Sequence, residues 1–229
     1  MTASVLDRVG AAGVVPVIEI EDAARAVSLA ATLADAGLPA VEITLRTPAA
    51  ISAIGAIAGE RPDVLLGAGT LLTPAEVRAA SEAGATFGVS PGFDAEVVAT
   101  AAEVGLPIVP GAITATEAQA CLRAGVRLLK FFPAVSSGGL PALRNLAAPF
   151  RHRGIAFMPT GGITEETLPE WLARSEVAAV GGSWLAPRAD VDAGDWEAIG
   201  ERARRARAIV EQVRGADATA GGSSAGGAR

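Results

Sequence analysis

Only one residue of this chain carries a primary amine on its side chain. Of its nineteen Lys and Arg residues, Lys130 alone is a lysine. It lies in the apolar run Arg127-Leu-Leu-Lys-Phe-Phe-Pro133. Burial among apolar side chains disfavours the charged ammonium, and the free amine is the form that attacks a ketone to give a Schiff base. The alternatives are a lysine that reaches solvent from the rim of the fold and one that binds phosphate.

A second polar group occurs in the run Val41-Glu-Ile-Thr-Leu-Arg46. Because side chains alternate across a strand, Glu42, Thr44 and Arg46 share one face and the apolar residues take the other. A carboxylate beside a guanidinium suits a group that transfers protons next to a clamp for a substrate carboxylate. A structural ion pair is the alternative.

Paired glycines occur at the carboxyl ends of two later predicted strands, in Pro159-Thr-Gly-Gly-Ile163 and Gly181-Gly-Ser-Trp184. Glycine lets the backbone approach an anion closely, and a following helix N-terminus supplies free N–H groups. Tight turns use the same residues, so either pair alone is weak evidence for a phosphate site. The segment Gly67-Ala-Gly-Thr70 adds a hydroxyl at the carboxyl end of a third predicted strand.

These groups need a fold that brings distant segments together. We predict strands at 14–20, 40–45, 64–70, 86–90, 108–110, 127–132, 156–160 and 179–182. Ala-rich segments such as 23–36, 74–83 and 115–124 separate them with helical periodicity, and glycines at 37, 84, 105, 125 and 154 suit helix C-caps. Eight βα units favour a (β/α)₈ barrel (TIM barrel), whose active site lies at the carboxyl ends of the strands. An open doubly wound sheet is the alternative.

Composition narrows the class of protein. The 229 residues carry a net charge of −6, which argues against nucleic acid as a partner, and no apolar run suits a membrane span. The basic run 202–207 is expected to be a solvated helix face. The single Cys121 fits a cytoplasmic setting, and the single His152 has no partner at metal-ligand spacing. We expect one catalytic domain over residues 1–214 and a disordered tail over 215–229.

Six motifs resemble those of the 2-keto-3-deoxy-6-phosphogluconate (KDPG) aldolases, also called KDPG/KHG aldolases. The likeness extends from about Val14 to Val213. The motifs are Glu42-Ile-Thr-Leu-Arg46, Gly67-Ala-Gly-Thr70, Ser90-Pro-Gly92, Lys130-Phe-Phe-Pro-Ala134, Pro159-Thr-Gly-Gly-Ile163 and Gly181-Gly-Ser-Trp-Leu185. Departures at 113–115 and 135–137 bear on substrate breadth. A related branch acts on the galactonate epimer, and 90–91 with 130–133 look more like the gluconate branch.

The resemblance implies a class I aldolase that uses no metal or other cofactor. It implies cleavage of KDPG to pyruvate and glyceraldehyde 3-phosphate, with 4-hydroxy-2-ketoglutarate as a second candidate substrate. It also implies a homotrimer and, through the family, the Entner–Doudoroff pathway, although the residues fix neither.

The resemblance implies a role for each residue that matches a functional position of the family's motifs. Lys130 matches the Schiff-base lysine, and Glu42 matches the general acid and base. Arg46 and Thr70 match groups that hold the substrate carboxylate. The residues on the family's phosphate and substrate side correspond to Thr160, Gly161, Gly162, Gly182 and Ser183 here. Its pocket-lining residues correspond to Pro91 and Phe132.

Two rival functions stay open on the residues alone. A phosphosugar epimerase or isomerase would use Glu42 and Lys130 as acid and base with no covalent step. A barrel that binds a phosphosugar without catalysis would serve as a sensor or an assembly part.

Overall fold

The computed structural model describes residues 3–222. The strands are β1 (Val14–Ile18), β2 (Ala40–Thr44), β3 (Leu65–Gly69), β4 (Phe87–Val89), β5 (Ile108–Val109), β6 (Leu128–Phe131), β7 (Ala156–Pro159) and β8 (Val180–Gly182). All eight predicted strands are present, and their ends lie within two residues of the predicted ones. The α/β class inferred from the repeat is confirmed.

The strands run parallel. Six form one curled sheet in the order β5-β4-β3-β2-β1-β8, and β6 and β7 form a separate pair. Two isolated parallel bridges connect the pair to the sheet, from Gly111 to Lys130 and from Thr160 to Gly181. Since the strands are parallel, their carboxyl ends meet at one end of the molecule.

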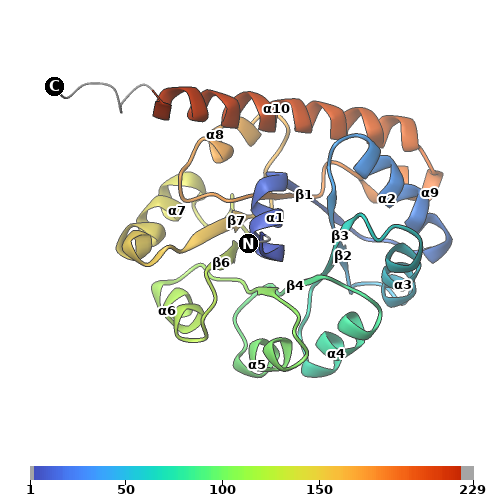
Figure 1. The fold of residues 1–229 in the computed structure, drawn as a ribbon, viewed down its shortest axis with the longest axis horizontal. Coiled ribbons are helices and arrows are strands. Elements are labelled where there is room, and N and C mark those ends of the chain that lie inside the picture. The colour runs from blue at the N-terminus through green and yellow to red at the C-terminus, as the bar shows by residue number, and fades with distance from the viewer. Residues whose placement is uncertain (1–2, 223–229) are drawn as a thin grey trace.

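Helices surround the strands in a ring (Figure 1). They are α1 (Val5–Ala12), α2 (Ala26–Asp35), α3 (Ala50–Glu60), α4 (Pro74–Glu82), α5 (Ala95–Glu103), α6 (Ala115–Arg123), α7 (Gly139–Ala147), α8 (Leu168–Leu172), α9 (Arg188–Ala193) and α10 (Trp196–Gly222), with 3₁₀ turns η1 (Ala23–Arg25) and η2 (Ala148–Arg153). Thr73 and Thr114 begin α4 and α6 with capping boxes. The predicted glycines at 37, 84, 105, 125 and 154 all have positive φ. Within residues 3–222, no helix combines the length and apolarity needed to cross a bilayer.

Two apolar clusters follow from the alternation of side chains along the strands. The larger lies between strands and helices and includes Val41, Ile43, Leu129 and Phe131. The smaller fills the space that the strands enclose, with Val15, Leu65, Phe87, Leu128 and Met158 among its members. The apolar face predicted for β2 therefore packs against helices, and Glu42 and Lys130 lie on the opposite, inward faces of β2 and β6.

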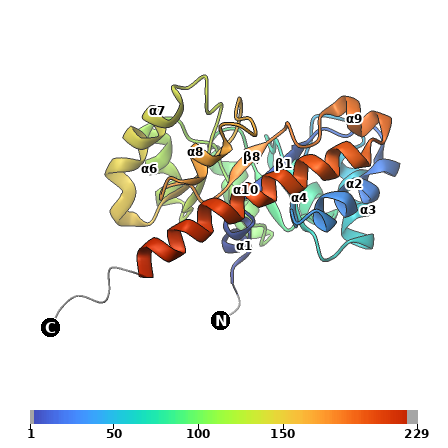
Figure 2. The same cartoon turned by 90° about the horizontal axis from the view of Figure 1, so that it is seen from above.

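Helix α1 closes the end of the molecule at which the strands begin. It lies in the middle of the ring and leads directly into β1 (Figures 1 and 2). Its residues Val9 and Ala12 belong to the inner cluster, and Ser4 caps it with a capping box to Asp7. The sequence analysis did not predict this helix. Apolar side chains of α1 therefore pack on the inner cluster at this end.

The C-terminal helix is longer than expected. The sequence predicts a disordered tail from Gly215, but α10 continues to Gly222, so that prediction is wrong for residues 215–222. Alanine recurs at every second position from Ala216, and its high helix propensity offsets the glycines. The rest of the predicted tail lies outside the described residues. In the basic run, Arg204 and Arg205 are exposed as expected, whereas Arg202 is half-buried and donates to the Leu185 carbonyl at 3.1 Å.

Candidate active site

Lys130 and Glu42 meet inside the fold, although 88 residues separate them in the chain. The Lys130 Nζ donates to Glu42 Oε1 at 3.2 Å. The Lys130 side chain is 6% exposed and that of Glu42 is 0% exposed. A buried amine paired with one buried carboxylate is the arrangement that acid–base or Schiff-base chemistry requires. The lysine is therefore not one that reaches solvent from the rim.

Backbone contacts on both sides fix Lys130. Its N–H donates to the Pro110 carbonyl at 2.9 Å, and its carbonyl accepts from the Ala112 N–H at 2.8 Å. On the other side it is in register with Met158 of β7. Lys130 is thus held between the ends of β5 and β7, and its Nζ lies 5.3 Å from the centre of the Phe132 ring.

Glu42 is confined by a glycine on the neighbouring strand. A Cβ at Gly69 would lie 2.2 Å from Glu42 Oε1, so only glycine leaves room for the carboxylate. The other oxygen, Oε2, is buried and has no hydrogen-bond partner among residues 3–222. Buried acceptors are normally satisfied, so this oxygen is free to accept a proton or a hydroxyl donor from a bound molecule.

Arg46 and Thr70 also meet, at the mouth above this pair. Arg46 Nε donates to the Thr70 hydroxyl at 3.3 Å. Thr70 has φ of 61°, which is unfavourable for a β-branched residue and is typically found where function demands it. Arg46 also forms an ion pair with Glu19, with Nη1 and Oε1 3.4 Å apart. The guanidinium is thus fixed between the ends of β1 and β3.

The two glycine-rich ends lie side by side. Thr160 bridges Gly181, and a Cβ at Gly181 would lie 2.2 Å from Thr160 Oγ1. Gly161 and Gly162 have φ of 100° and 78°, in the left-handed region that glycine favours. Gly182 lies directly beneath the Trp184 ring. Glycine at 181 and 182 thus leaves room for the Thr160 and Trp184 side chains.

One hollow lies between Arg46 and Ser183. It has a volume of about 470 Å³ and is lined by Glu19, Thr44, Arg46, Ser183 and Trp184, among others. Ser183 is exposed, so its hydroxyl is accessible. The space is large enough for a six-carbon phosphorylated acid.

The two predicted pocket-lining residues, Phe132 and Pro91, differ in how closely they approach Lys130. The Phe132 ring lies near Lys130 and 3.3 Å from the position of a Cβ at Gly161, so it connects the two halves of the site. Pro91 is half-buried, and its carbonyl oxygen packs against Gly111, which bridges Lys130. No hydrogen bond or ion pair within the described residues joins Pro91 to another site residue.

A family model described as "Aldolase: KDPG and KHG aldolase" matches residues 5–202. The KHG/KDPG aldolase of Escherichia coli K12 is 41% identical over 193 residues, which cover 84% of this chain and 90% of that protein. The chain belongs to the KDPG and KHG aldolase family.

Solved aldolase structures share the fold. The KDPG aldolase of Legionella pneumophila, with pyruvate captured at low pH as a covalent carbinolamine, has a TM-score of 0.83 and 37% identity, covering 86% of this chain and 96% of that one. The enzyme of Zymomonas mobilis ZM4 with 3-phosphoglycerate has a TM-score of 0.82 and 40% identity, covering 90% and 95%.

In this KDPG and KHG aldolase family member, two residues at the mouth were missed by sequence analysis. Glu19 follows β1 and shares the inward face with Val15 and Val17, so the alternation along 14–20 was a usable signal. The Trp184 indole Nε1 is buried with no hydrogen-bond partner among residues 3–222, which no sequence pattern indicates.

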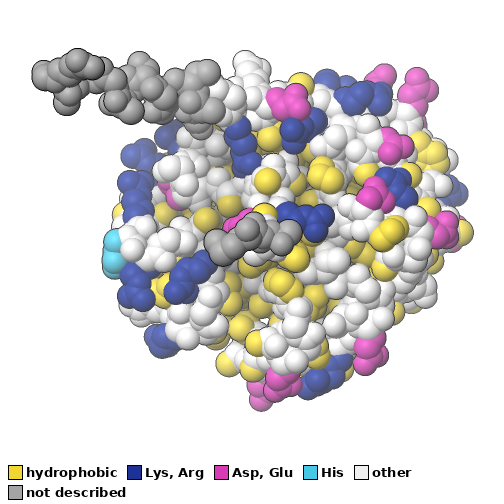
Figure 3. Space-filling model, viewed as in Figure 1, with side chains coloured by type: hydrophobic (Ala, Val, Ile, Leu, Met, Phe, Trp, Pro, Cys, Tyr) yellow, Lys and Arg dark blue, Asp and Glu magenta, His cyan; other side chains and the backbone are white. Residues whose placement is uncertain are grey.

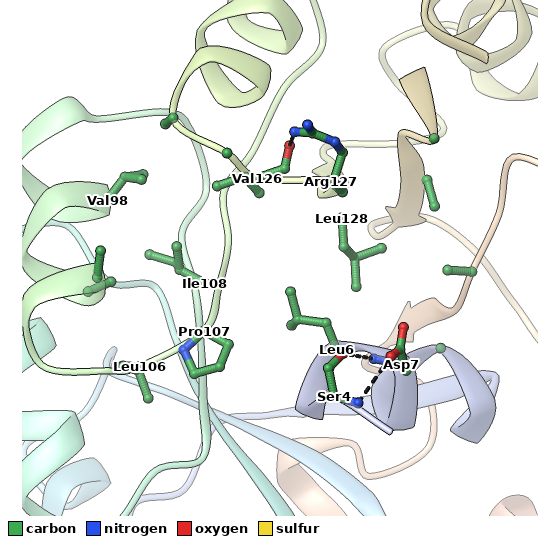
Figure 4. Close-up of a pocket in the computed structure, with 18 of the residues that line it drawn as sticks. Ser4, Leu6, Asp7, Val98, Leu106, Pro107, Ile108, Val126, Arg127 and Leu128 are labelled. Carbon is green, nitrogen blue, oxygen red and sulfur yellow. Dashed lines mark hydrogen bonds between the residues drawn. The ribbon is translucent and has the colours of Figure 1, made fainter. Parts of the chain in front are cut away.

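A larger hollow is at the opposite end. Its volume is about 700 Å³, and its lining is mainly apolar, including Leu6, Val98, Ile108 and Leu128 (Figure 4). It contains none of the predicted site residues. Lys130 and Glu42 line neither hollow, and the chemistry is expected near the smaller one because Arg46 lines it and follows the same strand as Glu42.

Cys121 lies in the core and His152 lies on the surface. Cys121 is buried in the outer cluster, and burial raises the pKa of its thiol to about 12. His152 is exposed on η2 between two arginines, on an edge of the molecule rich in basic side chains (Figure 3). Across residues 3–222, no three His, Cys, Asp or Glu side chains gather as a metal site would require.

Proposed function

We propose that this chain is a class I aldehyde-lyase that cleaves KDPG to pyruvate and glyceraldehyde 3-phosphate through a Schiff base on Lys130. The observation that carries the proposal is the buried contact of 3.2 Å between Lys130 Nζ and Glu42 Oε1. The family assignment and the carbinolamine of pyruvate in the Legionella relative support it.

The first step uses the hydrogen bond between the two residues. Transfer of one proton from Nζ to Oε1 gives a free amine and a carboxylic acid, and both neutral groups tolerate burial better than the charged pair. The amine adds to the C2 ketone to form a carbinolamine. Glu42 then returns its proton to the departing hydroxyl, so that water leaves and an iminium ion remains.

The iminium ion makes carbon–carbon cleavage possible. The electron pair of the C3–C4 bond moves into an enamine, while Glu42 takes the proton of the C4 hydroxyl and the aldehyde forms. Glu42 next protonates C3 of the enamine, and water hydrolyses the resulting iminium to pyruvate and free Lys130. The buried Oε2, without a partner in the described structure, suits these transfers because no other group competes for it.

The ends of the substrate are assigned to the two sides of the mouth. Arg46 and Thr70 hold the 1-carboxylate, which places C2 above the amine. The backbone around Gly161, Gly162 and Gly182 and the Ser183 hydroxyl bind the phosphate, so its binding energy positions the substrate. Thr160, Pro91 and Phe132 line the space between. The same site would accept 4-hydroxy-2-ketoglutarate, to give pyruvate and glyoxylate.

The proposal extends to the fold, the domain and the assembly. The eight strands are proposed to close into a (β/α)₈ barrel, which the two isolated bridges beside β6 and β7 support. Residues 1–214 would form one catalytic domain. A cytoplasmic homotrimer that serves the Entner–Doudoroff pathway follows from the family resemblance alone.

Borohydride trapping tests the proposal. With pyruvate present, borohydride should attach the three-carbon unit irreversibly to Lys130, as peptide mass spectrometry would detect. Lys130→Ala should abolish labelling and cleavage. For Glu42→Gln we expect lost turnover while the adduct still forms. Labelling that persists in Lys130→Ala would refute the assignment, and turnover without any adduct in the unmodified protein would favour the non-covalent epimerase or isomerase.

A further inference from the structure

Glu19 is a charged residue in a place where a negative charge is unexpected. It follows Ile18, the last residue of β1, and lines the hollow that contains Arg46 and Ser183. A substrate with a carboxylate and a phosphate would be repelled by it. Its side chain is 34% exposed, so it is neither fully solvated nor buried. Its one ion pair within residues 3–222 is with Arg46.

The contacts of Arg46 explain what Glu19 does there. A guanidinium binds a carboxylate bidentately along one of two edges, the Nε/Nη2 edge or the Nη1/Nη2 edge. Thr70 accepts from Nε, and Glu19 accepts from Nη1. Each edge therefore already has one protein partner, and within residues 3–222 only Nη2 has none.

The two partners differ in what they allow. The Thr70 hydroxyl can turn and donate to an arriving carboxylate, so the Nε/Nη2 edge stays usable. An ionised Glu19 has no proton to donate, so a second carboxylate cannot join it at the Nη1/Nη2 edge without repulsion.

The edge next to Thr70 adjoins the reacting groups. Gly69, which precedes Thr70, lies against the Glu42 carboxylate, and Glu42 binds Lys130. The Glu19 edge lies on the other side of the guanidinium, next to the end of β1. A carboxylate bound there would hold its keto group in a different direction from one bound beside Thr70.

We propose that Glu19 is a positioning residue that blocks one edge of Arg46, so that a 2-keto acid docks its carboxylate only on the edge beside Thr70. This inference rests on the proposed function, because it takes Arg46 as the carboxylate clamp. Glu19 thus excludes a non-productive orientation of the substrate.

Two substitutions of Glu19 separate the effect of blocking one edge of Arg46 from the effect of the negative charge of Glu19. Glu19→Ala opens the second edge, so substrate binds in two orientations, of which one is unproductive. Such binding lowers kcat and KM by the same factor, about twofold or more, and leaves kcat/KM nearly unchanged. Glu19→Gln keeps an oxygen on Nη1 but loses the charge, so we expect kcat to be unchanged and KM to fall. Glu21→Ala, a carboxylate that pairs with Arg188 instead, is the control and should match the unmodified enzyme.

A binding measurement makes the result independent of catalysis. In a Lys130→Ala background, which forms no Schiff base, calorimetry should show pyruvate binding about twofold or more tightly after Glu19→Ala. An unchanged or weakened affinity would overturn the inference even if the unmodified enzyme is labelled by borohydride. A raised KM, or an equal loss of kcat in Glu19→Gln and Glu19→Ala, would also overturn it.

Discussion

Replacing Gly69 with alanine should separate Glu42 from Lys130 without altering either residue. The new Cβ would lie 2.2 Å from Glu42 Oε1, 2.7 Å from its Cγ and 2.8 Å from its Cδ. Gly69 is in strand β3 and does not have a positive φ, so its backbone accepts alanine. Because close-packed atoms do not approach below about 3.0 Å, the carboxylate must retreat by about 0.8 Å.

The retreat is enough to break the contact. The Nζ–Oε1 distance of 3.2 Å would grow to about 4 Å, beyond hydrogen-bonding range. A displacement of about 1 Å in a reacting group costs about 10²-fold in rate, or about 2.7 kcal/mol of transition-state stabilisation. Overpacking should also lower the free energy of unfolding by about 1–3 kcal/mol.

The assay is steady-state cleavage of KDPG, coupled to pyruvate reduction, with thermal unfolding measured on the same samples. Gly69→Ala should lose about 10²-fold in kcat/KM at a temperature where it is folded. Gly59→Ala is the control, because a Cβ there meets nothing within 4 Å, and it should keep full activity. Wild-type turnover in Gly69→Ala would refute the view that the Glu42–Lys130 contact drives the chemistry.

Three further outcomes are expected. Gly181→Ala would place a Cβ 2.2 Å from the Thr160 hydroxyl, so KM for the phosphorylated substrate should rise more than KM for 4-hydroxy-2-ketoglutarate in parallel assays. Cys121, whose pKa burial raises to about 12, should resist iodoacetamide at pH 8 until urea unfolds the chain, as mass spectrometry would report. For Glu117, desolvation opposes the shift, but hydrogen bonds from Ile113 and Thr114 lower its pKa below 4.5. The α6 cap should therefore stabilise the fold above the unfolded pKa and be lost as pH falls through the folded one; Glu117→Gln should show a smaller acid-induced fall in Tm.

The strands could be predicted because each is a short apolar run, and five of them follow a glycine with positive φ at 37, 84, 105, 125 or 154. The same rule failed at the termini. Helix α1 precedes β1 and so lies outside the βα repeat that guided the prediction, and the glycines at 215 and 221–222 suggested disorder where alanines sustain a helix. Strand order was also out of reach, since it depends on packing between distant segments.

The inward face of β2 followed from alternation alone, so Glu42 was predicted on the correct side of its strand. For Lys130 the position at the rim of the fold stayed open until the structure placed it inside. The direct contact between Glu42 and Lys130 arises only from tertiary packing, and it depends on Gly69 leaving room for the carboxylate. Glu19 was overlooked because it lies within a run that reads as apolar overall. The strained φ of Thr70 has no sequence signal, since threonine rarely adopts it.

The packing of α1 on the inner cluster has a consequence for traffic through the enzyme. Val9 and Ala12 cover the starts of the strands, so on the proposed mechanism the substrate reaches Lys130 from the carboxyl ends. Cleavage frees the aldehyde while the three-carbon unit is still bonded to Lys130. The aldehyde is therefore released first and pyruvate last, and both leave by the end at which the substrate entered.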